Sequence, residues 1–337
     1  MTRPVLPGIL DAVGHTHLVE LSGLLPRFPS RVFAKLEAFN PGGSVKDRSA
    51  LSMLLGKIRN GELVPGRSTV VESSSGNLAI GIAQICRYFG LDFICVVDPK
   101  TTQQNLAILR AYQVTVDMVT ELDPDTGAYL PTRVKRVREL VDSTPGAYWP
   151  NQYANPLNPQ AHVQTMREID QALDGRVDYL FCSTGTGGTM TGCARYIRER
   201  GLSTTLVGVD AMGSVLFGGP SGPRLLPGHG AAVRPELFDP TLADEVVLVS
   251  DLDCVVGCRT LTQREAILAG GSSGAVTAAL GKLADRIPAG SNCVLIFPDR
   301  GDRYLDTIYS DDWVRAQFGE VSHLWKEPEH TGAVGAC

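Results

Sequence analysis

The sequence of 337 residues lacks the features that several large classes of protein require. No apolar run approaches the roughly 20 residues of a membrane span, and the N-terminus lacks the charged and apolar regions of a signal peptide. The net charge is −5 and no basic stripe is present, which argues against a nucleic-acid partner. We therefore expect a cytoplasmic protein with neither a membrane nor nucleic acid as its partner.

Paired cysteines are also missing. The eight cysteines are scattered, without a C-x-x-C pair, and most of them lie in apolar runs. That pattern is typical of reduced, buried thiols rather than of disulfides. His15 and His17 form an H-x-H pair, but no further ligand stands at a usable spacing, so we expect no metal site.

What is present is the composition of a globular protein, with 43% hydrophobic and 20% charged residues. The length suits two compact lobes or one large domain. Apolar runs and helical patterns alternate along the chain, with glycine or proline at many joints and no internal repeat. Alternation of this kind predicts an α/β fold with mainly parallel sheets flanked by helices.

The individual segments follow from the same patterns. The expected strands, after a first apolar run at 68–71, are 93–97, 115–119, 179–182, 206–209, 246–249 and 294–297. The expected helices are 49–58, 78–89, 104–112, 130–141, 162–173, 189–200 and 276–286. The stretch 145–159, which is rich in proline and asparagine, is the best domain boundary on composition.

One lysine stands where a Gly-rich turn gives way to a helical pattern. It is Lys46, in the run N-P-G-G-S-V-K-D-R at 40–48. Desolvation or a helix N-terminus lowers the pKa of a lysine amine and frees it for Schiff-base chemistry. Most lysines at helix starts are solvated surface groups, so this lysine alone leaves both interpretations open.

Two loops of small residues accompany the lysine. The run E-S-S-S-G-N at 72–77 and the run G-T-G-G-T at 185–189 each follow a predicted strand and precede a predicted helix. That arrangement directs backbone N–H groups and a helix dipole at one spot, which is how proteins hold anions. Either loop alone could be a plain tight turn.

Together the three segments resemble the fold type II pyridoxal-phosphate enzymes, the cysteine synthase family. That family carries an N-P-x-x-S-x-K-D-R lysine motif, an S-G-N loop and a G-T-G-G-T phosphate cup in this order. The run G-G-S-S-G-A at 270–275 matches a fourth family segment, and the resemblance extends from about Gly14 to Trp313. It implies the two-domain fold of tryptophan synthase beta and its relatives.

The resemblance also implies a division of the chain into lobes. Residues 36–150 would form an N-terminal lobe with the Schiff-base lysine and the loop for the substrate carboxylate. Residues 10–35 would pack with 151–318 to form a C-terminal lobe that binds the cofactor phosphate. We expect residues 319–337, which are small and polar, to be a poorly ordered tail.

Site residues and the cofactor, pyridoxal 5'-phosphate, are likewise implied by the resemblance. Lys46 would be the catalytic residue, bonded to the cofactor and later taking the Cα proton. The expected cofactor-binding residues are Lys46, Asn77, Gly185, Thr186, Gly187, Gly188, Thr189 and Ser272. The expected substrate-binding residues are Ser73, Ser74, Ser75, Gly76, Gln152, Tyr153 and Arg133.

The residue facing the cofactor's pyridine nitrogen predicts the reaction type. A serine at 272 cannot keep that nitrogen protonated as an aspartate would, so the ring is a weaker electron sink. This disfavours transamination and favours loss of a β-leaving group. We therefore expect β-elimination followed by β-addition, with amino acids as the substrates.

Five further segments are similar to one branch of the family, the N-(2-amino-2-carboxyethyl)-L-glutamate synthases of 2,3-diaminopropionate biosynthesis; they are 72–77, 96–100, 127–133, 210–219 and 297–306. Enzymes of that branch join O-phospho-L-serine to the amine of L-glutamate in siderophore and peptide-antibiotic pathways. Arg133 and Tyr153 match positions that bind phosphoserine there, and a guanidinium suits phosphate because it binds bidentately. A solvated helix arginine is the alternative for Arg133. The family also implies a homodimer.

Other functions stay open at this stage. A cysteine synthase that combines O-acetylserine or O-phosphoserine with sulfide would carry the same motifs. The glycines of 185–192 superficially suggest a dinucleotide-binding protein, but their spacing is not G-x-G-x-x-G and the loop lies in the middle of the chain. An inactive binding relative is a further alternative, against which the intact Lys46 argues.

Overall fold

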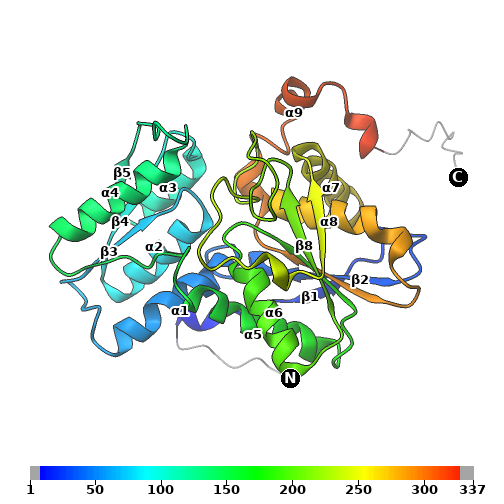
Figure 1. Cartoon of the computed structure of the whole chain (residues 1–337), viewed down its shortest axis with the longest axis horizontal. Coiled ribbons are helices and arrows are strands. Elements are labelled where there is room, and N and C mark those ends of the chain that lie inside the picture. Colours follow the sequence, from blue (N-terminus) through cyan, green and yellow to red (C-terminus); the bar gives the residue numbers. More distant parts are fainter. Residues whose placement is uncertain (1–7, 327–337) are drawn as a thin grey trace, which may run out of the picture.

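The computed structural model describes residues 8–326 (Figure 1). Two sheets lie side by side, each with helices packed on it. One has six strands in the order β1-β2-β10-β7-β8-β9, and the other has four in the order β5-β4-β3-β6. All neighbouring strands are parallel except β1 and β2, which pair antiparallel. The prediction of an α/β fold with mainly parallel sheets is confirmed.

The elements have the following bounds. The six-stranded sheet contains β1 (Leu18–Glu20), β2 (Arg31–Leu36), β7 (Tyr179–Ser183), β8 (Thr205–Ala211), β9 (Glu245–Val249) and β10 (Asn292–Phe297). The four-stranded sheet contains β3 (Thr69–Ser73), β4 (Asp92–Val97), β5 (Thr115–Met118) and β6 (Ala147–Tyr148). The α-helices are α1 (Lys46–Arg59), α2 (Asn77–Phe89), α3 (Gln103–Ala111), α4 (Tyr129–Ser143), α5 (Leu157–Ala172), α6 (Gly188–Arg200), α7 (Asp251–Glu265), α8 (Gly271–Leu283) and α9 (Asp311–Phe318). Short 3-10 helices are η1 (Ile9–Ala12), η2 (Glu37–Phe39), η3 (Pro240–Leu242), η4 (Ala284–Arg286), η5 (Gly301–Tyr304) and η6 (Ser322–Leu324).

Every strand and helix predicted from the sequence corresponds to an element of the structure. The prediction missed β1, β2, β6, α7 and α9, together with the 3-10 helices. Strand β2 reads Arg-Val-Phe-Ala-Lys-Leu, so its charged residues hide a segment in which all but the first residue are buried. Helix α1 begins three residues before the predicted start, at Lys46 itself.

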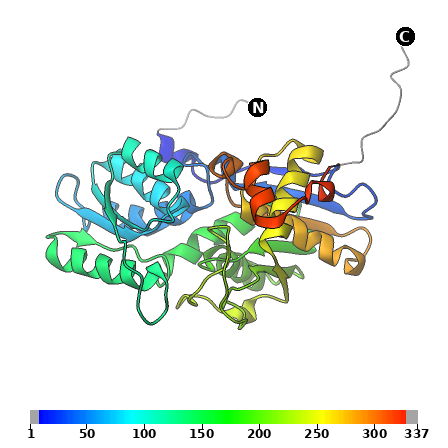
Figure 2. The ribbon, with the colours of Figure 1, turned by 90° about the horizontal axis from the view of Figure 1, so that it is seen from above.

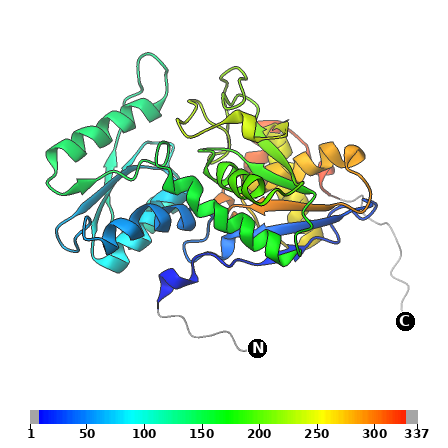
Figure 3. The ribbon, with the colours of Figure 1, turned by 60° about the horizontal axis from the view of Figure 1, so that its bottom comes forward.

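The strand order of the two sheets can be compared with the expected division into lobes. All strands of the four-stranded sheet come from residues 69–148, whereas the six-stranded sheet combines 18–36 with 179–297. Figures 2 and 3 show the two sheets and their helices on opposite sides of the molecule. This supports the division at 36 and 150, which stays a prediction. Of the tail expected from 319, residues 319–326 are described and include Trp325, buried against the core; 327–337 lie outside the described residues.

Close packing of two helices fixes the start of α8. A Cβ on Gly274 would lie 2.0 Å from the carbonyl oxygen of Cys254, and one on Gly257 would lie 2.2 Å from the carbonyl oxygen of Gly274. Glycine at both positions therefore lets α7 and α8 touch through their backbones. The seven described cysteines are buried and free, as expected. Within residues 8–326 we find no helix with the length and apolar character to cross a membrane.

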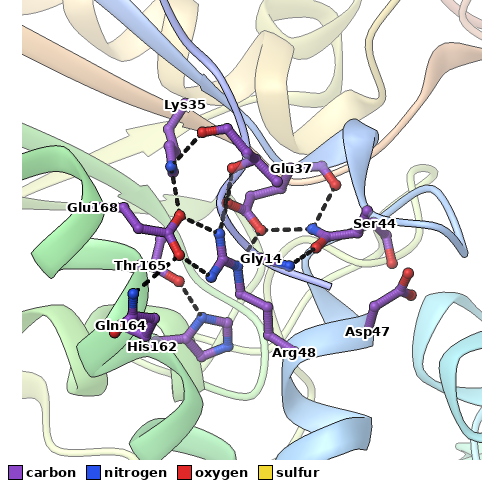
Figure 4. A network of polar contacts seen from close by, with 12 residues as sticks. Gly14, Lys35, Glu37, Ser44, Asp47, Arg48, His162, Gln164, Thr165 and Glu168 are labelled. Atoms are coloured by element: carbon purple, nitrogen blue, oxygen red, sulfur yellow. Dashed lines mark hydrogen bonds and ion pairs between the residues drawn. The ribbon is translucent and has the colours of Figure 1, made fainter. Parts of the chain in front are cut away.

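A buried cluster of charges connects the start of α1 to the six-stranded sheet (Figure 4). The Arg48 guanidinium lies 2.7 Å from a carboxylate oxygen of Glu37 and 2.7 Å from one of Glu168. Lys35 on β2 also lies 2.7 Å from Glu168. Burial opposes ionisation of Glu168, but the hydrogen bonds from Arg48 and Lys35 lower its pKa to about 2. The cluster thus combines two cationic and two carboxylate side chains.

Replacing Arg48 should destabilise the protein strongly. Arg48→Met removes the ion pair of buried Glu37 and leaves buried Glu168 with Lys35 alone, and breaking a buried pair costs about 3–5 kcal/mol. Urea unfolding of the cofactor-loaded protein measures the loss. Arg31→Met is the matched control, because the Arg31–Glu20 pair is exposed and its loss should leave the urea midpoint unchanged. Equal midpoints for the two variants would contradict the prediction.

Candidate active site

A cavity of about 350 Å³ opens between the two sheets. Its walls are the starts of α1, α2, α6 and α8, the end of β10 with the loop after it, and the loop between 224 and 233. These segments follow the carboxyl ends of parallel strands or begin helices, which is where open α/β sheets bind ligands. The cavity is therefore the candidate site.

The structure brings together all but one of the site residues expected from the sequence. Those that line the cavity are Lys46, Ser74, Ser75, Gly76, Asn77, Arg133, Gln152, Tyr153, Gly185, Thr186, Gly187, Gly188, Thr189 and Ser272. The exception is Ser73, the last residue of β3, which is buried and does not line the cavity. Among the described residues its hydroxyl has no hydrogen-bond partner.

Lys46 is the first residue of α1 and is half-buried. A turn precedes it, in which Gly43 has a φ of +82° and donates its N–H to the carbonyl of Asn40 at 2.8 Å. Only glycine adopts that backbone conformation without strain. Burial lowers the pKa of the Lys46 amine, although the carboxylate of Asp299 opposes the shift. A desolvated amine of this kind is a suitable nucleophile and base.

The loop 185–189 has the geometry of an anion site. A Cβ on Gly187, whose φ is +82°, would lie 2.5 Å from the Phe238 ring, and one on Gly188 would lie 2.4 Å from the Asn158 side chain. Glycine is thus required where the loop turns into α6. None of the five N–H groups from 185 to 189 donates to another described residue. Such N–H groups at a helix N-terminus fit a phosphate.

The loop 74–78 offers a second anion site. A Cβ on Gly76 would meet no atom within 4 Å, so the cavity comes directly against this backbone. The Ser74 hydroxyl accepts the N–H of Gly76 at 3.4 Å and that of Ala79 at 3.3 Å. Within residues 8–326 the N–H groups of Ser75, Asn77 and Leu78 have no partner. These groups, at the start of α2, fit a carboxylate.

Asp299 is a site residue that the sequence analysis did not identify. It follows β10, lines the cavity and is buried. Its Oδ2 accepts hydrogen bonds from Asn77 Nδ2 and from the Tyr304 hydroxyl, both at 2.8 Å. Arg303 donates to Asn77 Oδ1, so the Asn77 amide is held on both sides. A polar residue directly after a buried parallel strand is the signal that could have indicated Asp299.

Glu72 was also missed, although it precedes the serine loop. It is fully buried on β3, and its Oε1 accepts the Trp149 Nε1–H at 3.0 Å and the Ser73 N–H at 2.8 Å. Burial raises the pKa of Glu72 to about 7. Glu72 therefore links the base of the carboxylate loop to the chain segment that leads to Gln152.

Arg133 lies on α4 with its guanidinium buried at the cavity wall. Its Nη1 is 3.4 Å from Asp98 Oδ2, yet neither Nε nor Nη1 has a hydrogen-bond partner among the described residues. Buried donors are normally paired, because an unpaired one costs about 1–3 kcal/mol. The unpaired N–H groups make Arg133 an apt partner for an anion in the cavity.

This chain belongs to the pyridoxal-phosphate dependent enzyme family, whose model matches residues 9–299. Pyridoxal phosphate is therefore its cofactor. The free N–H groups of the loop 185–189 and the buried amine of Lys46 fit that group's phosphate and aldehyde. The resemblance to fold type II enzymes is thus confirmed, and the dinucleotide-binding alternative is set aside.

Within the family the chain is similar to two curated proteins named N-(2-amino-2-carboxyethyl)-L-glutamate synthase. The one from Ralstonia nicotianae is 46% identical over 311 residues, covering 92% of this chain and 91% of that protein. The one from Cupriavidus metallidurans is 46% identical over 314 residues, covering 92% of each chain. Among solved structures, the O-acetylserine dependent cystathionine beta-synthase from Helicobacter pylori is 34% identical with a TM-score of 0.83, covering 91% of this chain and all of that one. An O-ureido-L-serine synthase is 30% identical with a TM-score of 0.84, covering 93% of this chain and all of that one.

Lys46 should carry the cofactor covalently. The purified protein should be yellow, and borohydride reduction followed by peptide mass spectrometry should place the cofactor on Lys46. Lys46→Ala should lose both the covalent bond and turnover. Lys57, in the same helix and paired with exposed Glu62, is the control, and Lys57→Ala should retain both. A reduced adduct on any other lysine would show the assignment to be wrong.

Proposed function

We propose that this protein joins O-phospho-L-serine to the amine of L-glutamate by β-replacement and releases phosphate. The product would be N-(2-amino-2-carboxyethyl)-L-glutamate. The observation that carries the proposal is the 46% identity to the two synthases of that name over 92% of the chain. The buried guanidinium of Arg133, whose Nε and Nη1 have no hydrogen-bond partner among the described residues, supports the choice of a phosphorylated donor.

The proposed mechanism assigns a task to each part of the cavity. Pyridoxal phosphate, when bound, withdraws electrons from the Cα of an amino acid that is joined to it. The free N–H groups of the loop 74–78 would bind the donor's α-carboxylate, with Gln152 beside it. Lys46, released from the cofactor, would take the Cα proton as phosphate leaves Cβ, and would return it after the acceptor amine has added.

Arg133 and Tyr153 would hold the leaving group. The Nε–H and Nη1–H groups would be available to donate hydrogen bonds to a phosphate, which would also stabilise the charge that grows as the C–O bond breaks. Burial raises the pKa of Tyr153, so its hydroxyl stays protonated and can donate a hydrogen bond. Neither residue would be needed to bind a neutral acetyl group in this way.

The charge of the cavity supports an acidic acceptor. Lys46, Lys100, Arg133, Arg224 and Arg303 line it, against one carboxylate, Asp299, among the described residues. Clefts lined by one sign of charge concentrate ligands of the opposite sign. Glutamate carries two carboxylates and would find cationic partners there. Arg224 and Lys100 would be the candidates, since the Nε of Arg224 has no hydrogen-bond partner in the described part of the chain and Lys100 is exposed.

Cysteine synthesis from O-acetylserine or O-phosphoserine with sulfide is the second candidate. Its support is the similarity to solved enzymes of sulfur metabolism, including a hydrogen sulfide-producing enzyme from Fusobacterium nucleatum that is 30% identical with a TM-score of 0.82, covering 89% of this chain and all of that one. We favour the glutamate reaction because of the higher identity to the two synthases. We further propose a cytoplasmic homodimer that supplies 2,3-diaminopropionate to a siderophore or peptide-antibiotic pathway.

Arg133→Ala should lower kcat/KM for O-phospho-L-serine by about ten- to a hundredfold, because a hydrogen bond to a charged group contributes about 1.5–3 kcal/mol. The rate with O-acetyl-L-serine, slower in the wild type, should change little. Phosphate and acetate release measure the two reactions. Arg136→Ala is the matched control on the same helix, since Arg136 pairs with Asp117 at 2.9 Å on the surface. Equal losses with both donors would contradict the role of Arg133.

The acceptor test distinguishes the two candidate functions. Incubation with O-phospho-L-serine and L-glutamate should yield N-(2-amino-2-carboxyethyl)-L-glutamate by mass, with one phosphate released per product. Sulfide at the same concentration should give cysteine more slowly. If sulfide reacts much faster and glutamate is inert, the protein is a cysteine synthase and the proposal is wrong.

A further inference from the structure

Asp299 joins three of the segments that form the cavity. Its carbonyl accepts the N–H of Gly270 at 3.3 Å, and its backbone pairs with that of Ser44 in an isolated antiparallel bridge. Its side chain bonds to Asn77. Asp299 thus contacts the lysine segment, the carboxylate loop and the segment before Ser272. No other carboxylate of the described residues lines the cavity.

The Asp299 carboxylate is only partly paired. Oδ2 accepts two hydrogen bonds, from Asn77 and Tyr304, whereas Oδ1 has no partner among the described residues although Asp299 is only 2% exposed. A Cβ on Gly270 would lie 2.0 Å from Oδ1, so the glycine leaves room for this oxygen. A buried oxygen without a donor is costly in a protein interior, which points to a function.

Asp299 has two cationic neighbours, and Lys46 is one of them. Arg303 is the other, and it donates to Asn77 and to the carbonyl of Gly42 rather than to Asp299. Among the other groups near this pair, Tyr304, Cys258 and His162 are neutral, because burial raises the pKa of Tyr304 and Cys258 and lowers that of His162, whereas burial raises the pKa of Asp47 to about 7. Burial also raises the pKa of Asp299, while the hydrogen bonds from Asn77 and Tyr304 and the cations of Arg303 and Lys46 lower it. The Asp299 carboxylate in turn opposes the lowering of the Lys46 pKa.

We propose that Asp299 is a positioning residue of the cofactor site, whose carboxylate holds the amide of Asn77 and supplies a negative charge beside the nitrogen of Lys46. Ser272, which by the family resemblance would face the cofactor's pyridine nitrogen, carries no charge. Asp299 then supplies the negative charge of the cavity, and supplies it at the lysine. The inference rests on the proposed bond between Lys46 and the cofactor, but not on the identity of donor or acceptor.

Asp299→Asn removes the negative charge of the side chain and keeps its shape, so this variant tests the role of the charge. The asparagine oxygen can still accept from Asn77 and Tyr304. The loaded protein is titrated without substrates, and its visible absorption band is followed against pH. An opposite charge within about 4–6 Å shifts a pKa by about 1–3 units. The transition should therefore move to lower pH by about one unit or more in Asp299→Asn, and likewise in Asp299→Ser.

Asp302→Asn is the control for this titration, because Asp302 lies in the same loop but is exposed and pairs with Arg300 at 3.4 Å. Its curve should coincide with the wild-type curve. If the Asp299→Asn curve coincides as well, Asp299 is neutral in the working protein and the proposal is wrong. Because no substrate is present, this result is independent of whether glutamate or sulfide is the acceptor.

Asp299→Ala tests the hydrogen bond by which Asp299 positions the Asn77 amide. It removes the acceptor as well as the charge, so the cofactor's dissociation constant should rise about tenfold, the loss of one charged hydrogen bond. Asp299→Asn should stay within threefold of the wild type. Equilibrium dialysis gives both values, and melting without cofactor checks the fold. Equal affinities for the two variants would overturn the positioning role. If Asp299→Ala does not fold, Asp299→Val takes its place.

Discussion

The site depends on the buried ion cluster of Arg48, Glu37, Glu168 and Lys35, because it fixes the start of α1 against the six-stranded sheet. Lys46 lies two residues before Arg48, on a helix that packs against both α2 and α5. A second buried link runs beside the first: Ser49 donates to Asn158 at 2.8 Å, and Asn158 donates to the carbonyl of Gln152 at 2.8 Å. Ion pairs of this kind resist a shift of α1 relative to the six-stranded sheet more than apolar contacts do, since every displacement leaves a buried charge unpaired.

Once that link is made, the anion sites follow from parallel-sheet geometry. The carboxyl ends of β3 and β7 each lead through a small-residue loop into a helix, so N–H groups from both sheets face one cavity. Within residues 8–326, the N–H groups of Gly185 to Thr189 and those of Ser75, Asn77 and Leu78 have no hydrogen-bond partner. Such unpaired donors are unfavourable in an empty protein and favourable in a loaded one. We infer that binding of phosphate and carboxylate groups stabilises the fold as well as serving the reaction.

The sequence could predict features that are local. The loops 72–77 and 185–189 and the lysine turn each contain their own signal, because glycine and serine are needed where a strand meets a helix. The position of Asp299 after a buried strand is a local signal, but its role depends on burial and on partners such as Tyr304 in the next short helix. Glu72 has no local signal, since its importance comes from burial and from Trp149, more than 70 residues away. Strand β2 was missed for the same reason: Lys35 looks like a surface residue until Glu168, far along the chain, neutralises it. The lobe boundaries remain predictions for which the strand order is support.

The cationic side chains of the cavity lie on different walls. The chain is acidic overall, with a net charge of −5, yet five cationic side chains and one carboxylate line the cavity. Arg133 lies on the wall formed by α4, whereas Arg224 lies on the loop that follows β8, and the Asp299–Lys46 pair lies with the cofactor loops. In the proposed reaction, a substrate with an anionic leaving group would be drawn toward Arg133, and a second anionic substrate would meet Arg224 and Lys100. Hydrosulfide needs neither, because it is small and carries a single charge. The arrangement of cations therefore favours two polyanionic substrates that bind in succession, which is the physical basis for preferring an amino-dicarboxylate acceptor.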